Sequence, residues 1–302
     1  MSSHEVQPRR EPFSFIRKAA ELFRKERPLT FEAFAKTHAY VKVNETLIGI
    51  WFNQLPNQFS FLDVAGGTGL VAKILKKKAE LTKREGLIIG VDPNKDSLAV
   101  ARKTIHSTKK IFIEFIEGLG QNLGTLLKGK IPGEKFDGAS IHDAIHEIEG
   151  EGNKIAVLNA IADMLKKGGI FSLNSSFTTE SMDHKSRLEW GRWRKRAADL
   201  LKLKRNKQEK PIEVHTPDEY VSMVEKAGFV IEKRGLSEVS LNRKALEAIS
   251  LYPTFIEGFL KGFFMPETLT MREKSNALIE ALKELKIKSL RRNWFELVAR
   301  KV

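Results

Sequence analysis

The chain has 302 residues, a hydrophobic fraction of 41%, no cysteine and a formal net charge of +14. Without cysteine it has no disulfide, thiolate metal site or cysteine nucleophile, and no apolar run approaches the roughly 20 residues of a membrane span. Charged residues stand where a signal peptide needs an apolar core, which predicts a cytoplasmic protein, and the basic excess favours anionic partners.

The N-terminal residues predict a small helical cap. Residues 1–10 are polar, and apolar side chains then recur at helical spacing through 13–24. A second apolar segment covers 39–55. We therefore expect residues 1–56 to form a helical N-terminal cap on the main domain.

From residue 57 the pattern changes to short apolar runs separated by helical stretches. The first five runs are 61–65, 87–91, 111–116, 136–141 and 170–174. Strands that alternate with helices at such intervals indicate βαβ units and a parallel sheet. Two later runs, 229–233 and 294–300, predict a sixth and a seventh strand. This pattern assigns residues 57–237 to an α/β core and 291–302 to its final strand.

Two segments break this rhythm. The first is a basic insert at 178–211, in which the stretch from Lys185 to Lys210 has eleven basic and three acidic residues. One interpretation is structural: a solvated helix face over an apolar face that contains Trp190 and Trp193. The alternative is a surface that binds anions. The second segment, 238–290, predicts a helical insert over an acceptor pocket, with an aromatic run at Tyr252, Phe255, Phe259 and Phe263.

A glycine-rich turn follows the first predicted strand. Residues 61–69 read Phe-Leu-Asp-Val-Ala-Gly-Gly-Thr-Gly, and a helix is expected from about Leu70. Glycines in such a turn let the backbone approach a ligand closely, and the following helix presents free amides to it. A dinucleotide turn expects G-x-G-x-x-G, and the third glycine of that pattern is missing here.

An acidic residue ends the second predicted strand. Asp92 lies in the sequence Gly-Val-Asp-Pro-Asn, where its two carboxylate oxygens can accept hydrogen bonds from the two hydroxyls of a ribose. Taken alone, Asp92 could equally cap the helix expected from about Lys95. Together with the glycine-rich turn, it predicts a nucleoside cofactor.

The spacing of these residues resembles the first motifs of class I S-adenosylmethionine-dependent methyltransferases, with Ala65 in place of the first glycine. The resemblance covers residues 59–177 and implies a Rossmann-like, mostly parallel seven-stranded sheet with an antiparallel last strand. It implies that Asp63 holds the ammonium of the cofactor and that Gly67 and Gly69 leave room for its methionine part. The cofactor-binding residues that it implies are Asp63, Ala65, Gly66, Gly67, Gly69, Asp92, Pro93, Leu119, Gly120, Gln121 and His142.

Two histidines follow the fourth predicted strand and are the candidate general bases. His142 aligns with a residue that lies beside the methyl-bearing sulfonium in the family, and His146 shares a helix face with it if a helix starts there. No third ligand accompanies the pair, so no metal is expected. Asp143 and Glu147 are expected to cap a helix, or to orient an imidazole.

The acceptor is not named by these motifs. The leading hypothesis is methylation of a small organic molecule, apolar or acidic, at oxygen, nitrogen or carbon. The asparagine/aspartate-proline-proline-aromatic motif of exocyclic-amine methyltransferases is missing after the fourth strand, which argues against adenine-N6 and glutamine-amide acceptors. An RNA methyltransferase that uses the basic insert is the first alternative, and a non-catalytic cofactor-binding protein is the second. The oligomeric state is left open.

Overall fold

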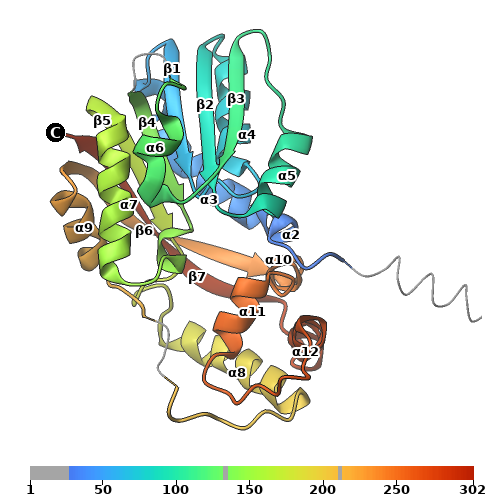
Figure 1. The fold of residues 1–302 in the computed structure, drawn as a ribbon. Coiled ribbons are helices and arrows are strands. Elements are labelled where there is room, and N and C mark those ends of the chain that lie inside the picture. Colours follow the sequence, from blue (N-terminus) through green and yellow to red (C-terminus); the bar gives the residue numbers. More distant parts are fainter. Residues whose placement is uncertain (1–26, 132–134, 210–212) are drawn as a thin grey trace, which may run out of the picture.

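The computed structural model describes residues 27–131, 135–209 and 213–302 (Figure 1). Among these residues, seven strands form one sheet in the order β3-β2-β1-β4-β5-β7-β6. The strands are β1 (Gln58–Val64), β2 (Glu85–Asp92), β3 (Ile111–Glu117), β4 (Phe136–His142), β5 (Leu165–Ser175), β6 (Phe229–Asn242) and β7 (Ser289–Lys301). The first five are parallel, and β7 pairs antiparallel with both β5 and β6. The predicted Rossmann-like, mostly parallel sheet is confirmed.

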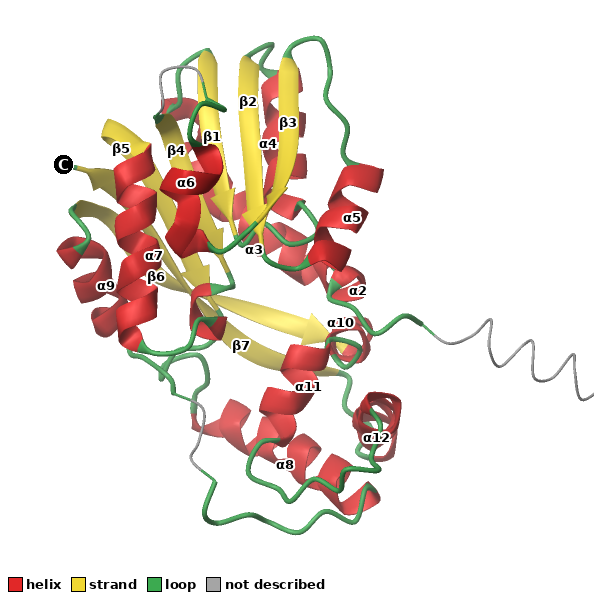
Figure 2. Cartoon of the chain, viewed as in Figure 1, coloured by secondary structure: helices red, strands yellow, loops and turns green. Residues whose placement is uncertain are grey.

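Helices cover both faces of the sheet, as Figure 2 shows. One face carries α6 (Leu123–Leu127), α7 (Glu151–Met164) and α9 (Pro217–Lys226), and the other carries α3 (His38–Trp51), α4 (Leu70–Leu81) and α5 (Lys95–Thr104). Because successive side chains of a strand point to opposite faces, neighbouring residues serve different cores. Phe61 packs in the core with α3 and α4, whereas Leu62 packs in the core with α7. These central strands therefore read as continuous apolar runs.

The described part of the N-terminal cap contains two α-helices and ends in a short 3-10 helix, η1 (Phe52–Gln54). The α-helices are α2 (Glu32–Ala35) and α3, and the side chain of Thr37 caps α3 by accepting a hydrogen bond from the Tyr40 amide. α3 packs against the sheet through Leu47, Ile48 and Trp51. The helix predicted within 13–24 lies outside the described residues.

A separate helical layer lies beyond one end of the sheet, at the bottom of Figure 1. It contains α8 (His184–Leu200), α10 (Arg243–Ile249), α11 (Pro253–Leu260) and α12 (Met271–Glu284). β6 pairs with β7 through Asn242, opposite Ser289. The first five residues of the segment predicted as a helical insert, 238–242, are therefore strand, because pairing with β7 outweighs the weak helical spacing there.

Helix α8 has an aromatic inner face and a charged outer face. Trp190 and Trp193 are buried, and their indole nitrogens donate to the carbonyl oxygens of Arg291 and Leu278, each at 2.9 Å. On the outer face, Lys195 pairs with Asp199 at 2.7 Å. Most basic residues of this helix thus lie on an exposed face, opposite an apolar face, as the structural interpretation of the insert expected.

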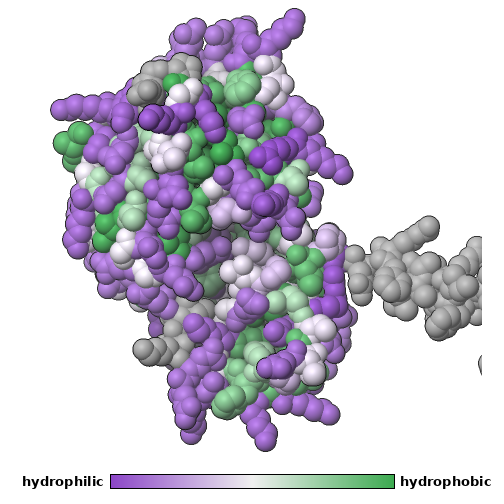
Figure 3. All heavy atoms as spheres, viewed as in Figure 1, coloured by the Kyte–Doolittle hydropathy of each residue, from purple (hydrophilic) through white to green (hydrophobic). Residues whose placement is uncertain are grey.

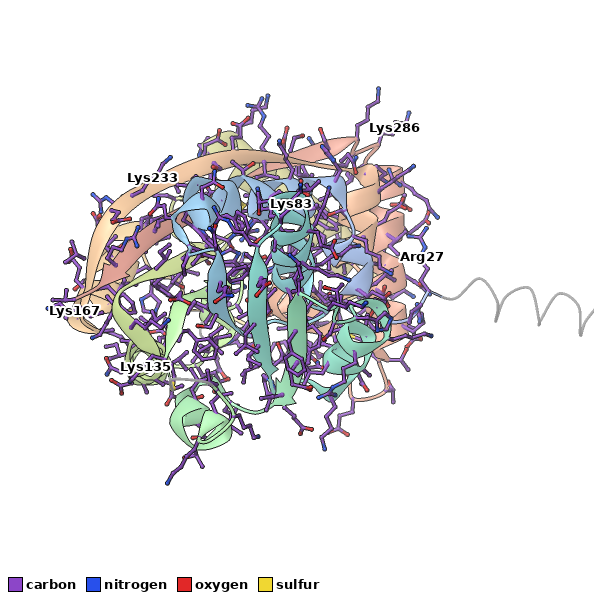
Figure 4. The ribbon with its side chains drawn as sticks, turned by 90° about the horizontal axis from the view of Figure 1, so that it is seen from above. Arg27, Lys83, Lys135, Lys167, Lys233 and Lys286 are labelled. Carbon is purple, nitrogen blue, oxygen red and sulfur yellow. The ribbon has the colours of Figure 1, made fainter. Side chains whose placement is uncertain are left out.

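The positive charge is spread around the molecule. In Figure 4, Lys167, Lys233 and Lys286 lie at separate edges and their side chains point outward. None of the helices in the described ranges is both long and apolar enough to cross a membrane.

Trp193 anchors the helical layer, since its side chain is fully buried against α11 and α12. We expect Trp193→Ala to lower the free energy of unfolding by about 3 to 5 kcal/mol, because it removes a large buried ring and leaves a cavity. Leu188→Ala, on the exposed side of the same helix, should change it by no more than about 0.5 kcal/mol. Urea denaturation measures both, and equal losses in the two variants would contradict this packing.

Candidate functional site

Two adjoining cavities lie at the carboxyl ends of the parallel strands, where open α/β sheets bind ligands. The first has a volume of about 460 Å³ and the second about 990 Å³. Figure 3 shows this face of the molecule hollowed between the upper part, with the sheet, and the lower part, with α8. Five residues line both cavities and mark their junction: Phe31, Asp143, Glu147, Tyr252 and Thr254.

The glycine-rich turn after β1 forms one wall of the first cavity. Gly67 has a positive φ of 52°, and a Cβ placed on it would meet no atom within 4 Å. Gly69 also has a positive φ, but a Cβ there would lie 2.5 Å from Cδ1 of Ile105. Gly67 therefore keeps the cavity open, whereas Gly69 permits close packing of the turn on the core and does not line the cavity. Ala65 holds the left-handed conformation, at φ 55°.

Asp63 places an unsatisfied carboxylate oxygen at this cavity. Its Oδ1 accepts a hydrogen bond from Oγ of Ser140 at 2.8 Å, while its buried Oδ2 has no partner among the described residues. Burial raises the pKa of Asp63 to about 7, against the smaller opposing effect of the Ser140 hydrogen bond. A buried carboxylate with one free oxygen is a binding group for a cation that enters the cavity.

Asp92, at the end of β2, joins two loops. Its Oδ2 accepts from the Gly67 amide and its Oδ1 accepts from the Asn94 amide, both at 2.8 Å. Burial raises the pKa of Asp92, although these two hydrogen bonds lower it. The cap of α5 is the side chain of Asn94, which accepts from the Ser97 amide, so the capping alternative for Asp92 is wrong.

The remaining residues expected at the cofactor surround the same cavity. Its lining includes Asp63, Ala65, Gly66, Gly67, Asp92, Pro93, Leu119, Gly120, Gln121 and His142. Of the residues that the resemblance implied, only Gly69 is missing from this lining. The motifs of four strand ends thus converge on one space.

His142 uses both ring nitrogens within the protein. Nδ1 lies 2.8 Å from Oδ1 of Asn44. Because Nδ2 of Asn44 donates to the carbonyl oxygen of Tyr40, Oδ1 is the acceptor and Nδ1 of His142 carries the proton. Nε2 lies 2.9 Å from Oγ of Ser172, from which it accepts. Burial lowers the pKa of His142 to about 3. His142 has no free lone pair for a substrate proton, and we do not retain it as a base.

His146 lies apart from His142, on the 3-10 helix η3 (Ile145–Glu147), so the two do not share a helix face. Its ring stacks on Phe177 with centroids 4.3 Å apart and lines the second cavity. Burial and the charge of Arg292 lower the pKa of His146 to about 3. An imidazole held neutral in this way is a weak base.

Glu147 and Asp143 are the acidic groups at the junction. They were expected to cap a helix or to orient an imidazole, and they do neither. Oδ1 of Asp143 accepts from the amide and the hydroxyl of Ser176, at 2.9 and 2.8 Å. The hydroxyl of Tyr252 donates to the carboxylate of Glu147, at 3.0 and 3.1 Å from its two oxygens. Burial raises the pKa of Asp143 to about 6 and that of Glu147 to about 7. Glu147 is exposed to solvent at the junction, although protein groups surround it on most sides.

Aromatic and basic side chains both line the second cavity. Its wall includes Phe177, Trp190, Phe255, Phe259 and Trp294. Of the aromatic run expected to face an acceptor pocket, Tyr252, Phe255 and Phe259 line this cavity, and Phe263 does not. Arg194, which the sequence placed in the exposed charge run, also faces inward and donates through Nε to the carbonyl oxygen of Phe259 at 2.7 Å.

The raised pKa of Asp63 has a consequence for stability. Because the folded state favours the protonated form, the wild type should lose stability as pH rises from the unfolded pKa of 3.8 toward about 7. Asp63→Asn is neutral at every pH and should gain about 2 to 3 kcal/mol relative to the wild type between pH 5 and pH 8. Urea denaturation at the two pH values measures the free energy of unfolding of both proteins. An equal change in both between pH 5 and pH 8 would show that Asp63 does not titrate in this range.

Comparisons with known proteins agree with this architecture. The model of a family described as a methyltransferase domain matches residues 62–171. A candidate methyltransferase from Bacillus halodurans C-125 is 17% identical, with a TM-score of 0.51 over 86% of this chain and 99% of that one. The YcgJ protein from Bacillus subtilis is 14% identical, with a TM-score of 0.50 over 86% of this chain and 98% of that one. No curated protein matches the sequence. Residues 62–171 are thus similar to a methyltransferase domain, and the strand order and the solved structures show that the chain has the Rossmann-like fold of these proteins.

Proposed function

We propose that the protein binds S-adenosylmethionine in the first cavity and methylates a small organic acceptor held in the second. The observation that carries this proposal is the junction of the two cavities at Asp143, Glu147 and Tyr252. A ligand in each cavity would bring two reacting groups together at this junction, and holding reactants in such an arrangement is a large part of catalysis.

The residues of the first cavity suit this cofactor. The unpartnered Oδ2 of Asp63 is a carboxylate acceptor for an ammonium group, and the open space beside Gly67 admits an aliphatic chain. Both oxygens of Asp92 face backbone amides and keep further lone pairs for ribose hydroxyls. When bound, S-adenosylmethionine supplies an electrophilic methyl group on a sulfonium.

Glu147 is the group best placed to take a proton from the acceptor. Its pKa of about 7 lets it exist as a carboxylate at neutral pH and still bind a proton there, which suits a general base. The hydroxyl of Tyr252 holds the carboxylate at the junction. A proton from an acceptor hydroxyl or amine would move to a Glu147 oxygen while the acceptor atom gains the methyl group.

Two observations support a small acceptor over RNA. The inner face of α8 places Trp190 in the wall of the second cavity with Phe255 and Phe259, and such a wall suits the apolar body of a small acceptor. The labelled lysines of Figure 4 also lie at separate edges of the molecule. Ionisable groups with displaced pKa values at the cavity junction favour an enzyme over a protein that only binds the cofactor.

Cofactor binding is tested with two glycines that both stand at positive φ. Gly67→Val and Gly129→Val each place a side chain at positive φ where no atom lies within 4 Å, but only Gly67 lines the first cavity. We expect Gly67→Val to lose S-adenosylmethionine binding in calorimetry, because its methyl groups fill the cavity, and Gly129→Val to bind as the wild type does.

Retained binding in Gly67→Val, with both variants folded, would place the cofactor elsewhere. Tight wild-type binding of RNA at physiological salt, weakening steeply as salt increases, would favour the RNA alternative.

The role of Glu147 is tested with acceptors found by screening small organic acids, phenols and amines for formation of S-adenosylhomocysteine. We expect kcat to rise with pH through about 7 as Glu147 ionises, and Glu147→Gln to lower kcat by about 10²- to 10⁴-fold and flatten this profile. Glu151→Gln, an exposed position outside both cavity linings, is the control and should keep both. An unchanged profile in Glu147→Gln would show that another group takes the proton.

A further inference from the structure

A buried arginine stands in the wall of the second cavity. Arg292 lies on β7 and is only 7% exposed. Its guanidinium lies over the ring of Phe177, with its central carbon 4.0 Å from the ring centroid, and 5.2 Å from that of Trp190. The charge is thus held among apolar rings, where an ion without a partner is costly.

Arg292 has few partners within the protein. Its Nε donates to the carbonyl oxygen of Ser176 at 2.5 Å, and in the described part of the chain its two Nη groups have no hydrogen bond. No Asp or Glu of the described residues lies within 4 Å of it in an ion pair. Burial lowers the pKa of Arg292 to about 10, so it remains a cation at neutral pH.

Three other arginines line this cavity, of which Arg205 is exposed, and Arg187 and Arg194 differ from Arg292 in their contacts. Arg187 donates from Nε and from one Nη to the carbonyl oxygens of Met182 and Thr179. Arg194 likewise donates from Nε and one Nη to two carbonyl oxygens at the end of α11. These two side chains hold the helical layer together through their terminal groups, whereas the terminal groups of Arg292 remain available to a ligand.

We propose that the acceptor carries a carboxylate on an apolar body, with the carboxylate bound by the Nη groups of Arg292 and the body against Phe177, Trp190 and Phe255. A guanidinium binds a carboxylate through parallel N–H donors, and the fixed position of Nε leaves the Nη groups to do so. This assignment rests on the proposed function for the acceptor's identity, but carboxylate binding itself does not depend on it.

A monoanion fits this position better than a phosphate dianion. Arg292 supplies one positive charge, and Asp143 lies close enough to raise its pKa, which means that a negative charge already faces the guanidinium. A second negative charge on the ligand would be repelled by Asp143 at this position. The ligand class is therefore a carboxylic acid with an aromatic or aliphatic body.

The test compares three probes with one ring system: 1-naphthoate, 1-naphthalenemethanol and 1-naphthyl phosphate. Binding to the full chain is followed by calorimetry and by quenching of tryptophan fluorescence, since Trp190 and Trp294 line the cavity. We expect 1-naphthoate to bind at least tenfold more tightly than the alcohol, as hydrogen bonds to a charged group allow, and more tightly than the phosphate.

Arg292→Gln should weaken 1-naphthoate binding at least tenfold and change binding of the alcohol by less than twofold. Arg291→Gln is the matched control, because Arg291 is the neighbouring residue, 55% exposed at its side chain and paired with Glu238 on the outside. Arg292→Lys keeps a positive charge without the fork and should retain part of the affinity.

Equal binding of acid and alcohol by the wild type, tighter binding of the phosphate, or equal losses in the Arg291 and Arg292 variants would overturn the assignment. The wild-type comparison decides the matter even if Arg292→Gln does not fold. Calorimetry with S-adenosylmethionine separates the two proposals, because failure of cofactor binding would sink the methyltransferase proposal and leave a carboxylate-binding cavity.

Discussion

The shape of the first cavity depends on the hydrogen bonds that the carboxylate of Asp92 accepts. This carboxylate accepts hydrogen bonds from the Gly67 amide and the Asn94 amide, and so connects the loops that follow β1 and β2. Because Gly67 stands at positive φ with empty space beside its Cα, the loop needs this external restraint to keep its amide directed at β2. Asp92, which the sequence motif assigns to the ligand, is thus also a structural group of the protein itself.

Two unsatisfied charged groups of opposite sign face the two cavities. Asp63 has a buried oxygen without a partner at the first cavity, and Arg292 has unbonded terminal groups at the second. Each lowers the stability of the protein, because the Asp63 oxygen has lost its hydration without gaining a hydrogen bond, and the Arg292 terminal groups have only the charge of Asp143 nearby and no hydrogen bond. Each would recover that loss by binding a ligand ion of opposite charge. The pair therefore predisposes one cavity to a cation and the other to an anion.

The sequence predicted the sheet and most of the first cavity because both arise from local patterns. The apolar runs located all seven strands, and the residues around Asp63, Asp92 and Gly120 came from motifs that each lie at one strand end. The junction was not predictable in this way. Tyr252 and Glu147 are 105 residues apart and meet only through the fold.

The role of His142 could not be predicted from the sequence for the same reason. Residue type and position made His142 a reasonable base, but its partners, Asn44 and Ser172, come from a helix and a strand distant in sequence. No local pattern reports that both ring nitrogens are occupied. The extension of β6 through 238–242 was missed for a related reason, because its alternation is weak and its stability comes from pairing with β7.

The length of β7 means that the residues of the second cavity differ in how freely they can change during evolution. This strand passes from the sheet core, where Phe295 and Leu297 are buried, to the second cavity, where Arg292 and Trp294 form the wall. Arg292 is therefore fixed by the register of a strand that pairs with β6 along its length. Two of the aromatic side chains around it, Trp190 and Phe255, belong to α8 and α11, which lie outside the sheet. Mutations in those helices can reshape the apolar body that is accepted, while the charge at its end stays tied to the folding of the core.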